Sequence, residues 1–292
     1  MIGRRAILSG IGCAALPLSR ALSQAATAGG QVMAASGYRV EFDEYPASGP
    51  LALVLMHGKN SFNRVANIRA FAEKIAAAGT TVVVPNMPWG RTWNGTADDA
   101  KAAVDALVAR AAAAGKRVVV GGLSLGATFA MVWRPADPPP AVVAKAFLNP
   151  GGLLDMTPPT APFWRRVTPE VERAKALEAA GQGRVAVRFT GSNAVGTSFV
   201  EETYTTTPEI YLSFHDTARF PSVRAALPMT RLPVFWSSGT RDPTASAKRR
   251  SFDMLAGHPA SVFLEPEGDH NSAFVPAADP LAAWLKANFA RG

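Results

Sequence analysis

Cysteine is almost absent from this sequence of 292 residues, in which Cys13 is the one example. It lies within the first 25 residues, in a segment that we expect to be an export signal and to play no part in the fold. A chain processed there would have no cysteine, which excludes disulfides, thiolate metal sites and a cysteine nucleophile. No spacing of metal-ligating side chains is visible either, so we expect neither a metal nor an organic cofactor.

Acidic residues are also scarce, with 22 Asp and Glu against 30 Lys and Arg, which gives a net charge of +8. Removing Arg4, Arg5 and Arg20 with the signal lowers that charge to +5. The other basic residues are scattered, and Lys248-Arg249-Arg250 is their longest run. No interleaving of basic and aromatic residues indicates a nucleic-acid surface, so we interpret the charge as solvated surface. After the signal, no apolar run is long enough to span a membrane.

The first 25 residues have the organisation of an export signal. Met1-Ile2-Gly3-Arg4-Arg5 is basic, residues 6–18 are apolar, and Ser23-Gln24-Ala25 offers small residues for cleavage. The paired arginines resemble a twin-arginine signal, from which Gly3 and Ile7 depart. A plain secretory signal or a short membrane anchor is the alternative. In each case we expect a bacterial protein outside the cytoplasm, either periplasmic or secreted.

Apolar segments, in contrast, are abundant: 48% of the residues are hydrophobic, enough for one large core. Continuous apolar runs predict buried parallel strands, and helix-periodic or alanine-rich segments stand between them. Residues 38–45 alternate and predict an edge strand. The alternation of strand and helix predicts an α/β fold with a doubly wound, mostly parallel sheet. The predicted strands of that sheet are 51–56, 80–84, 118–120, 142–148, 233–237 and 260–264, and its predicted helices include 63–78, 96–115, 245–256 and 280–289.

More than 80 residues separate the strand at 142–148 from the next core strand, at 233–237. This interval is much longer than an ordinary crossover. It contains patterns of its own, which predict a helix over 169–180, a strand over 184–190 and a short helix beginning near Thr207. We interpret residues 153–228 as a cap insertion within a domain spanning 36–292, because the insertion leaves from the carboxyl end of a strand. A lobe that only adds stability is the alternative.

One short motif, Gly122-Leu123-Ser124-Leu125-Gly126, predicts the chemistry. Gly-x-Ser-x-Gly between a buried strand and a helix is typical of a tight turn that exposes a serine nucleophile. The glycines are needed because a side chain at either position would collide with the neighbouring backbone as the chain reverses. An ordinary Gly-rich loop is the alternative interpretation.

A serine nucleophile needs a base, and the base needs a carboxylate to orient it. In a parallel sheet the ligand lies beyond the carboxyl ends of the strands. Of the four histidines, His270 lies just beyond a predicted strand with the flexible Gly268 before it, whereas His57 also follows a strand but stands beside Gly58 in what resembles a backbone-donor loop. Asp242 follows the preceding strand and is favoured over Asp269, whose position next to His270 makes the geometry awkward. The candidates placed less well are His57, His215, His258, Asp137 and Asp155.

Four segments in this order, each after its own strand, resemble the α/β-hydrolase superfamily over nearly the whole chain after the signal. They are His57-Gly58, residues 122–126, residues 239–242 and residues 268–270. The resemblance implies a serine hydrolase that cleaves an ester-like acyl bond through Ser124, Asp242 and His270 and an acyl-enzyme intermediate. A short helix after Ser124 and the lack of a glycine run after Gly58 are departures that leave the subfamily open.

The resemblance further implies an oxyanion hole built from the backbone N–H groups of Leu125 and Lys59, with Asn60 as the alternative to Lys59. It implies a structural role for His57. The expected partner is a small acyl substrate, and the fold does not decide among esterase, peptidase, thioesterase and acyltransferase. A non-catalytic binding protein is a further alternative. The aromatic residues that either line an acyl pocket or pack in the core are Trp89, Trp93, Phe163 and Trp164.

Overall fold

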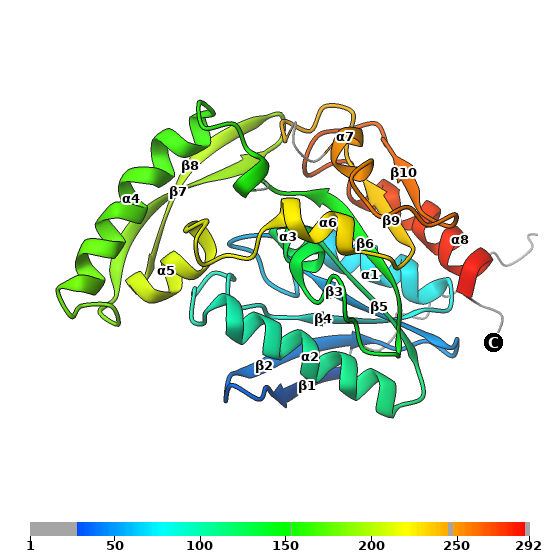
Figure 1. Cartoon of the computed structure of the whole chain (residues 1–292). Helices are drawn as coiled ribbons and strands as arrows, with labels where there is room; N and C mark the ends of the chain where they lie inside the picture. The colour runs from blue at the N-terminus through cyan, green and yellow to red at the C-terminus, as the bar shows by residue number, and fades with distance from the viewer. Residues whose placement is uncertain (1–27, 153, 245–247, 290–292) are drawn as a thin grey trace, which may run out of the picture.

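The computed structural model of the protein describes residues 28–152, 154–244 and 248–289. The predicted export signal lies outside these residues. An eight-stranded sheet runs through the molecule in the order β1-β2-β4-β3-β5-β6-β9-β10 (Figure 1). Strand β2 pairs antiparallel with β1 and β4, and the other neighbouring strands pair parallel. The predicted fold class is therefore confirmed. The strands are β1 (Ala28–Met33), β2 (Arg39–Tyr45), β3 (Leu51–Met56), β4 (Thr81–Pro85), β5 (Arg117–Ser124), β6 (Val142–Pro150), β9 (Val234–Ser237) and β10 (Val262–Leu264).

Helices cover both faces of the sheet, which explains why the central strand β3 is apolar at every position. Along β3, Ala52, Val54 and Met56 belong to one core cluster, whereas Leu53 and Leu55 belong to the other. The first cluster includes α2 (Ala97–Ala113), α3 (Leu125–Val132) and α6 (Val223–Met229). The second includes α1 (Ala66–Ala77), α8 (Ala278–Phe289) and the short turn η3 (Val275–Ala277).

Between β6 and β9 the chain forms a group of elements of which all but α6 lie at the left and top of Figure 1, while α6 lies near the centre of the view beside α3. Strands β7 (Val187–Val195) and β8 (Ser198–Thr206) pair as an antiparallel hairpin, against which α4 (Pro162–Ala179) packs. Helix α5 (Pro208–His215) packs on α4, and the short turn η1 (Leu154–Met156) contacts α6. We refer to residues 154–229 as the cap segment. No helix of the described chain is both long and apolar enough to cross a membrane.

Several predicted elements were right in type but wrong in position or extent. The strand β2 is not at the edge of the sheet, because the Gly-rich β1 pairs outside it. Helix α4 begins at Pro162, earlier than predicted, and includes Pro169 in its interior, where proline removes one helical hydrogen bond. The predicted helix over 245–256 is reduced to α7 (Arg249–Phe252), and residues 245–247 lie outside the described chain.

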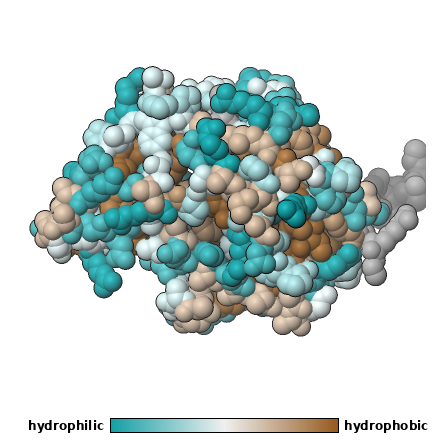
Figure 2. All heavy atoms as spheres, viewed as in Figure 1, coloured by the Kyte–Doolittle hydropathy of each residue, from teal (hydrophilic) through white to brown (hydrophobic). Residues whose placement is uncertain are grey.

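Polar and apolar side chains are interspersed over the face seen in Figure 2. Many charged groups at the surface are paired across elements. Arg64 binds Asp43 through two nitrogens, at 2.9 and 3.0 Å, and Arg134 binds Asp105 in the same way, at 2.8 and 2.9 Å.

Candidate active site

Ser124 is the last residue of β5 and stands at the N-cap of α3. Its backbone has φ of 56° and ψ of −120°, a left-handed conformation that a side chain adopts only under strain. The two motif glycines allow this turn. A Cβ on Gly122 would lie 2.5 Å from the carbonyl carbon of Gly126, and a Cβ on Gly126 would lie 2.5 Å from the carbonyl oxygen of Met56. The strand-to-helix crossing thus requires glycine at both positions.

The three residues predicted to form a triad come together at the carboxyl ends of three strands. His270 Nε2 lies 2.9 Å from Ser124 Oγ, and His270 Nδ1 lies 2.7 Å from Asp242 Oδ2. Asp242 follows β9 and His270 follows β10, and all three residues are buried. The rejected alternative, Asp269, instead accepts hydrogen bonds from the backbone N–H groups that follow it, those of Asn271 and Ser272.

Asp242 is held in its ionised form. Burial alone would raise the pKa of its carboxyl group, but the hydrogen bond with His270 and the attraction of that ring keep the pKa below its ordinary value. The backbone N–H of Thr244 adds a donor at 2.8 Å to Oδ1. A carboxylate here accepts the Nδ1–H of His270, which leaves Nε2 as an acceptor facing the Ser124 hydroxyl.

Backbone approaches Ser124 from two sides. Leu125 is the first residue of α3, so its N–H has no partner within the helix. On the opposite side, the loop after β3 comes so close that a Cβ on Gly58 would lie 3.1 Å from Ser124 Cβ. In that loop the N–H of Asn60 donates to Trp89 O at 3.0 Å. The Asn60 N–H is therefore engaged elsewhere, which favours Lys59 as the candidate donor.

His57 fixes the start of this loop. Its Nδ1 lies 2.8 Å from Gly58 O, and its Nε2 accepts the N–H of Met87 at 3.0 Å. Burial lowers the pKa of the ring to about 4, so the imidazole is neutral and Nδ1 is the donor. Both ring nitrogens bind backbone, which agrees with the structural role that the resemblance implied.

A sequence profile of the alpha/beta hydrolase family matches residues 53–284. The chain belongs to this family. It is a hydrolase by family, as the sequence predicted. A search of curated proteins finds no match for the sequence.

Solved structures with the alpha/beta hydrolase fold superpose on most of the chain. The alpha/beta hydrolase GrgF from Penicillium sp. sh18 has a TM-score of 0.68 at 15% identity, with 91% of this chain and 99% of that chain covered. DcsB, solved with a substrate analogue, has a TM-score of 0.68 at 13% identity, with 90% and 100% covered. A monoacylglycerol lipase from Paleococcus ferrophilus has a TM-score of 0.61 at 17% identity, with 84% and 99% covered. At these identities the likeness shows the fold alone.

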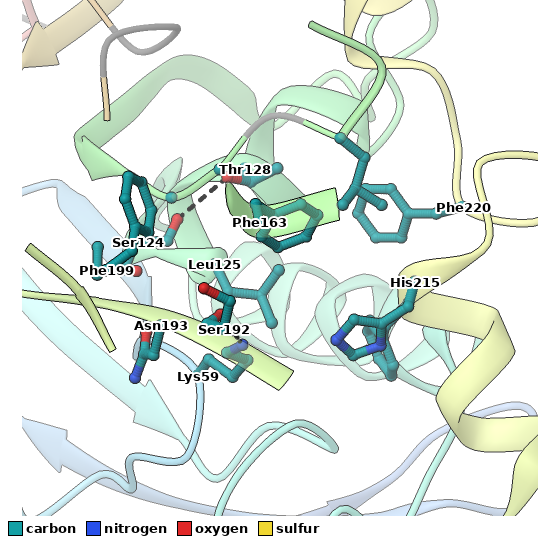
Figure 3. Close-up of a pocket in the computed structure, with 15 residues that line it drawn as sticks. Lys59, Ser124, Leu125, Thr128, Phe163, Ser192, Asn193, Phe199, His215 and Phe220 are labelled. Atoms are coloured by element: carbon teal, nitrogen blue, oxygen red, sulfur yellow. Dashed lines mark hydrogen bonds between the residues drawn. The ribbon is translucent and has the colours of Figure 1, made fainter. Parts of the chain in front are cut away.

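A cavity in this alpha/beta hydrolase opens beside Ser124, and the cap segment supplies most of its wall (Figure 3). Ser124 and Phe199 lie at one end and Phe220 and His215 at the other, with Leu125 and Phe163 between them. The apolar lining residues are Leu125, Leu154, Phe163, Ala194, Phe199, Phe214 and Phe220, and the polar side chains of the lining besides Ser124 are Lys59, Thr128, Ser192, Asn193 and His215.

Of the four aromatic residues considered for this wall, Phe163 lines the cavity. Trp89 and Trp93 are instead buried in the core, where Trp89 packs on Phe129 at 5.1 Å between ring centroids and Trp93 stacks on Tyr204 at 4.3 Å. Trp164 donates to Thr157 O at 3.1 Å.

Sequence reasoning missed the contribution of the β7–β8 hairpin to this hydrolase's site. Strand β8 was not predicted, because its charged and threonine-rich sequence has no clear apolar face. Ser192, Asn193 and Phe199 of the hairpin line the cavity beside Ser124. No cluster of three or more His, Cys, Asp or Glu side chains that could hold a metal ion occurs in the described part of the chain.

Proposed function

We propose that this hydrolase cleaves a carboxylic ester with an apolar acyl group through Ser124. The observation that supports this most directly is the unbroken line of hydrogen bonds from Asp242 through His270 to Ser124, at 2.7 and 2.9 Å. Such a line activates a hydroxyl group that is otherwise a poor nucleophile.

The proposed reaction has two stages. Ser124 Oγ attacks the ester carbonyl carbon while His270 Nε2 takes the hydroxyl proton, and Asp242 stabilises the resulting imidazolium. The carbonyl oxygen becomes negative and is stabilised by the N–H groups of Leu125 and Lys59. His270 then protonates the departing alcohol, and the acyl group stays on Ser124. A water molecule, deprotonated by His270, attacks the acyl carbon, and His270 returns that proton to Ser124 Oγ as the bond between Oγ and the acyl group breaks and the acid is released.

The cavity supports the choice of an apolar acyl group. Phe163, Phe214 and Phe220 present rings to it, and burying an apolar chain against them is favourable by roughly 25 cal/mol per Å². Its polar side chains are largely engaged: Lys59 pairs with Glu202 at 2.5 Å, and burial keeps His215 neutral by lowering its pKa to about 3. Several proteins of this fold are named esterase or lipase, which agrees with the proposal.

Labelling with a fluorophosphonate probe tests the nucleophile. The wild-type protein should label and lose its activity on labelling, Ser124→Ala should neither label nor hydrolyse the ester, and Ser192→Ala should label normally. Ser192 is a matched control because it is a second buried serine in the same cavity. A panel of p-nitrophenyl esters, thioesters and amides of increasing acyl length then identifies the bond cleaved. Hydrolysis by Ser124→Ala at more than about a hundredth of the wild-type rate would refute the assignment.

We further propose that residues 1–25 direct export by the twin-arginine route, on the strength of their sequence alone. Replacing Arg4-Arg5 with two lysines should leave the full chain in the cytoplasm, whereas a plain secretory signal would tolerate the change. Fractionation of expressing cells measures the outcome, and unaltered export of the Lys-Lys chain would contradict this route.

A further inference from the structure

The β7–β8 hairpin contacts two loops of the proposed active site, the one that carries His270 and the one that carries Lys59. At its tip, Gly196 O accepts the backbone N–H of His270 at 3.1 Å, and Gly196 N–H donates to the side chain of Asn271 at 2.9 Å. The hairpin therefore holds the loop that presents the proposed base. In Figure 1 the hairpin extends from the outer side of the cap segment toward the loops near β9 and β10.

Midway along the hairpin, a second set of contacts reaches the loop after β3. Lys59 Nζ lies 2.5 Å from Glu202 Oε1 and donates to Ser192 O at 2.5 Å. The other carboxylate oxygen of Glu202 accepts a hydrogen bond from the Asn60 amide at 2.6 Å. One carboxylate thus binds the side chains of both residues that follow Gly58.

The Lys59–Glu202 ion pair, called the bridge below, is well shielded from water, since the two side chains are 10% and 14% exposed. Shielding strengthens an ion pair and makes the loss of one partner costly, because the remaining charge is left without compensation. By holding the Lys59 side chain, the bridge also holds the backbone of Lys59, whose N–H is one of the two proposed oxyanion donors. Its N–H must point at the oxygen that becomes negative, and small displacements of such donors reduce the rate strongly.

We propose that Glu202 is a positioning residue that orients the backbone N–H of Lys59 toward the oxyanion. This inference rests on the proposed serine-hydrolase function. Glu202 does not contact the reacting atoms, and its effect passes through the loop that it binds. A carboxylate that merely fastens the cap segment would change stability or substrate affinity, whereas a positioning residue changes the rate of the step in which negative charge develops.

The neighbouring Glu201 provides a matched control. It lies on the same strand with its side chain 61% exposed, and the nitrogen of its ion-pair partner, Arg166 Nε, is 3.9 Å away. Glu201→Gln and Glu202→Gln therefore make the same chemical change at adjacent positions, one outside and one inside the bridge. Lys59→Met removes the bridge from its other end and keeps the backbone N–H.

The experiment measures kcat, KM and the second-order rate of fluorophosphonate labelling for each full-length variant. Glu202→Gln should lower kcat and the labelling rate about 10- to 100-fold, with KM changed less than about 3-fold, because removing an oxyanion donor altogether typically costs more. Glu201→Gln should stay within about 2-fold of the wild type. Lys59→Met combined with Glu202→Gln should cost less than the sum of the two single losses, since both changes remove the Lys59–Glu202 ion pair.

Several outcomes would overturn the inference: equal labelling rates for Glu202→Gln and the wild type, equal effects of the two Glu→Gln changes, or additive losses in the double variant. Circular dichroism establishes that each variant is folded. If Glu202→Gln does not fold, Lys59→Met provides the same test, with the same expected loss in kcat and labelling. A wild-type protein that never labels would instead refute the proposed function, so the two failures are distinguishable.

Discussion

His215 couples the stability of the cap segment to pH. Its ring stacks on Tyr211 at 4.3 Å between centroids, with Nδ1 3.0 Å from Tyr211 O and Nε2 2.9 Å from the Tyr204 hydroxyl. Burial, followed by the positive charge of Lys59, lowers the pKa of this imidazole from 6.5 to about 3. The folded protein therefore keeps His215 neutral at pH values where the unfolded chain protonates it.

The sign and size of the effect follow from these two pKa values. A folded-state pKa below the unfolded value contributes stability that is complete above about pH 6.5 and is lost as the pH falls toward 3. Between about pH 7.5 and 5.5 the unfolded histidine gains most of a proton, and the folded one gains almost none. The unfolded state is thereby favoured by about 1.4 kcal/mol over this interval.

Urea unfolding followed by tryptophan fluorescence at these two pH values measures the loss. From pH 7.5 to 5.5, the free energy of unfolding should decrease in both proteins, and the decrease should be about 1.4 kcal/mol smaller in His215→Gln than in the wild type. Tyr204→Phe is the control, because it removes the hydrogen bond to Nε2 but keeps the buried imidazole, so its pH-dependent loss should match the wild type. Other titrating groups, including the buried His57, are common to all three proteins and cancel. Equal losses in the wild type and His215→Gln would refute the argument.

Three further predictions concern the site and the core. Asp242→Asn should lower kcat/KM about 10³- to 10⁴-fold, measured on the best ester, because the amide no longer holds the active tautomer of the base; a loss below about 10-fold would contradict this. Gly151→Ala should lower kcat/KM about 10-fold without changing the melting temperature, since its Cβ would stand 3.3 Å from Leu125 N and 3.4 Å from Ser124 Oγ. Lys145 is buried, which lowers its pKa to about 7, and it donates to two carbonyl groups at the end of α3. Relative to Lys145→Met, the free energy of unfolding of the wild type should rise by up to about 1.4 kcal/mol per pH unit between about pH 7 and 10. Urea unfolding measures this difference, and the same dependence on pH in both proteins would contradict the prediction.

The central sheet and the positions of Ser124, Asp242 and His270 were predictable because each depends on a local signal. A strand buried on both faces must be apolar throughout, and side chains that follow parallel strands share one edge of the sheet. The choice between Lys59 and Asn60 had no such signal. It depends on whether Trp89, in a different loop, accepts the N–H of Asn60, and nothing in the neighbouring residues indicates that contact.

The polar part of the site that was not predicted lies mostly in the β7–β8 hairpin, and one physical property of β8 explains this. A strand that is half exposed and packs on other loops through polar groups has no need of an apolar face, so β8 shows little strand periodicity. In the sequence, Glu201 and Glu202 are two equivalent surface carboxylates. The fold separates them, because alternate residues of a strand face opposite sides, so Glu202 meets Lys59 while Glu201 stays exposed. The residues that could react are thus recognisable in the sequence because they follow strands. How the loops that carry Lys59 and His270 are held depends on polar contacts with the hairpin, which the sequence does not reveal.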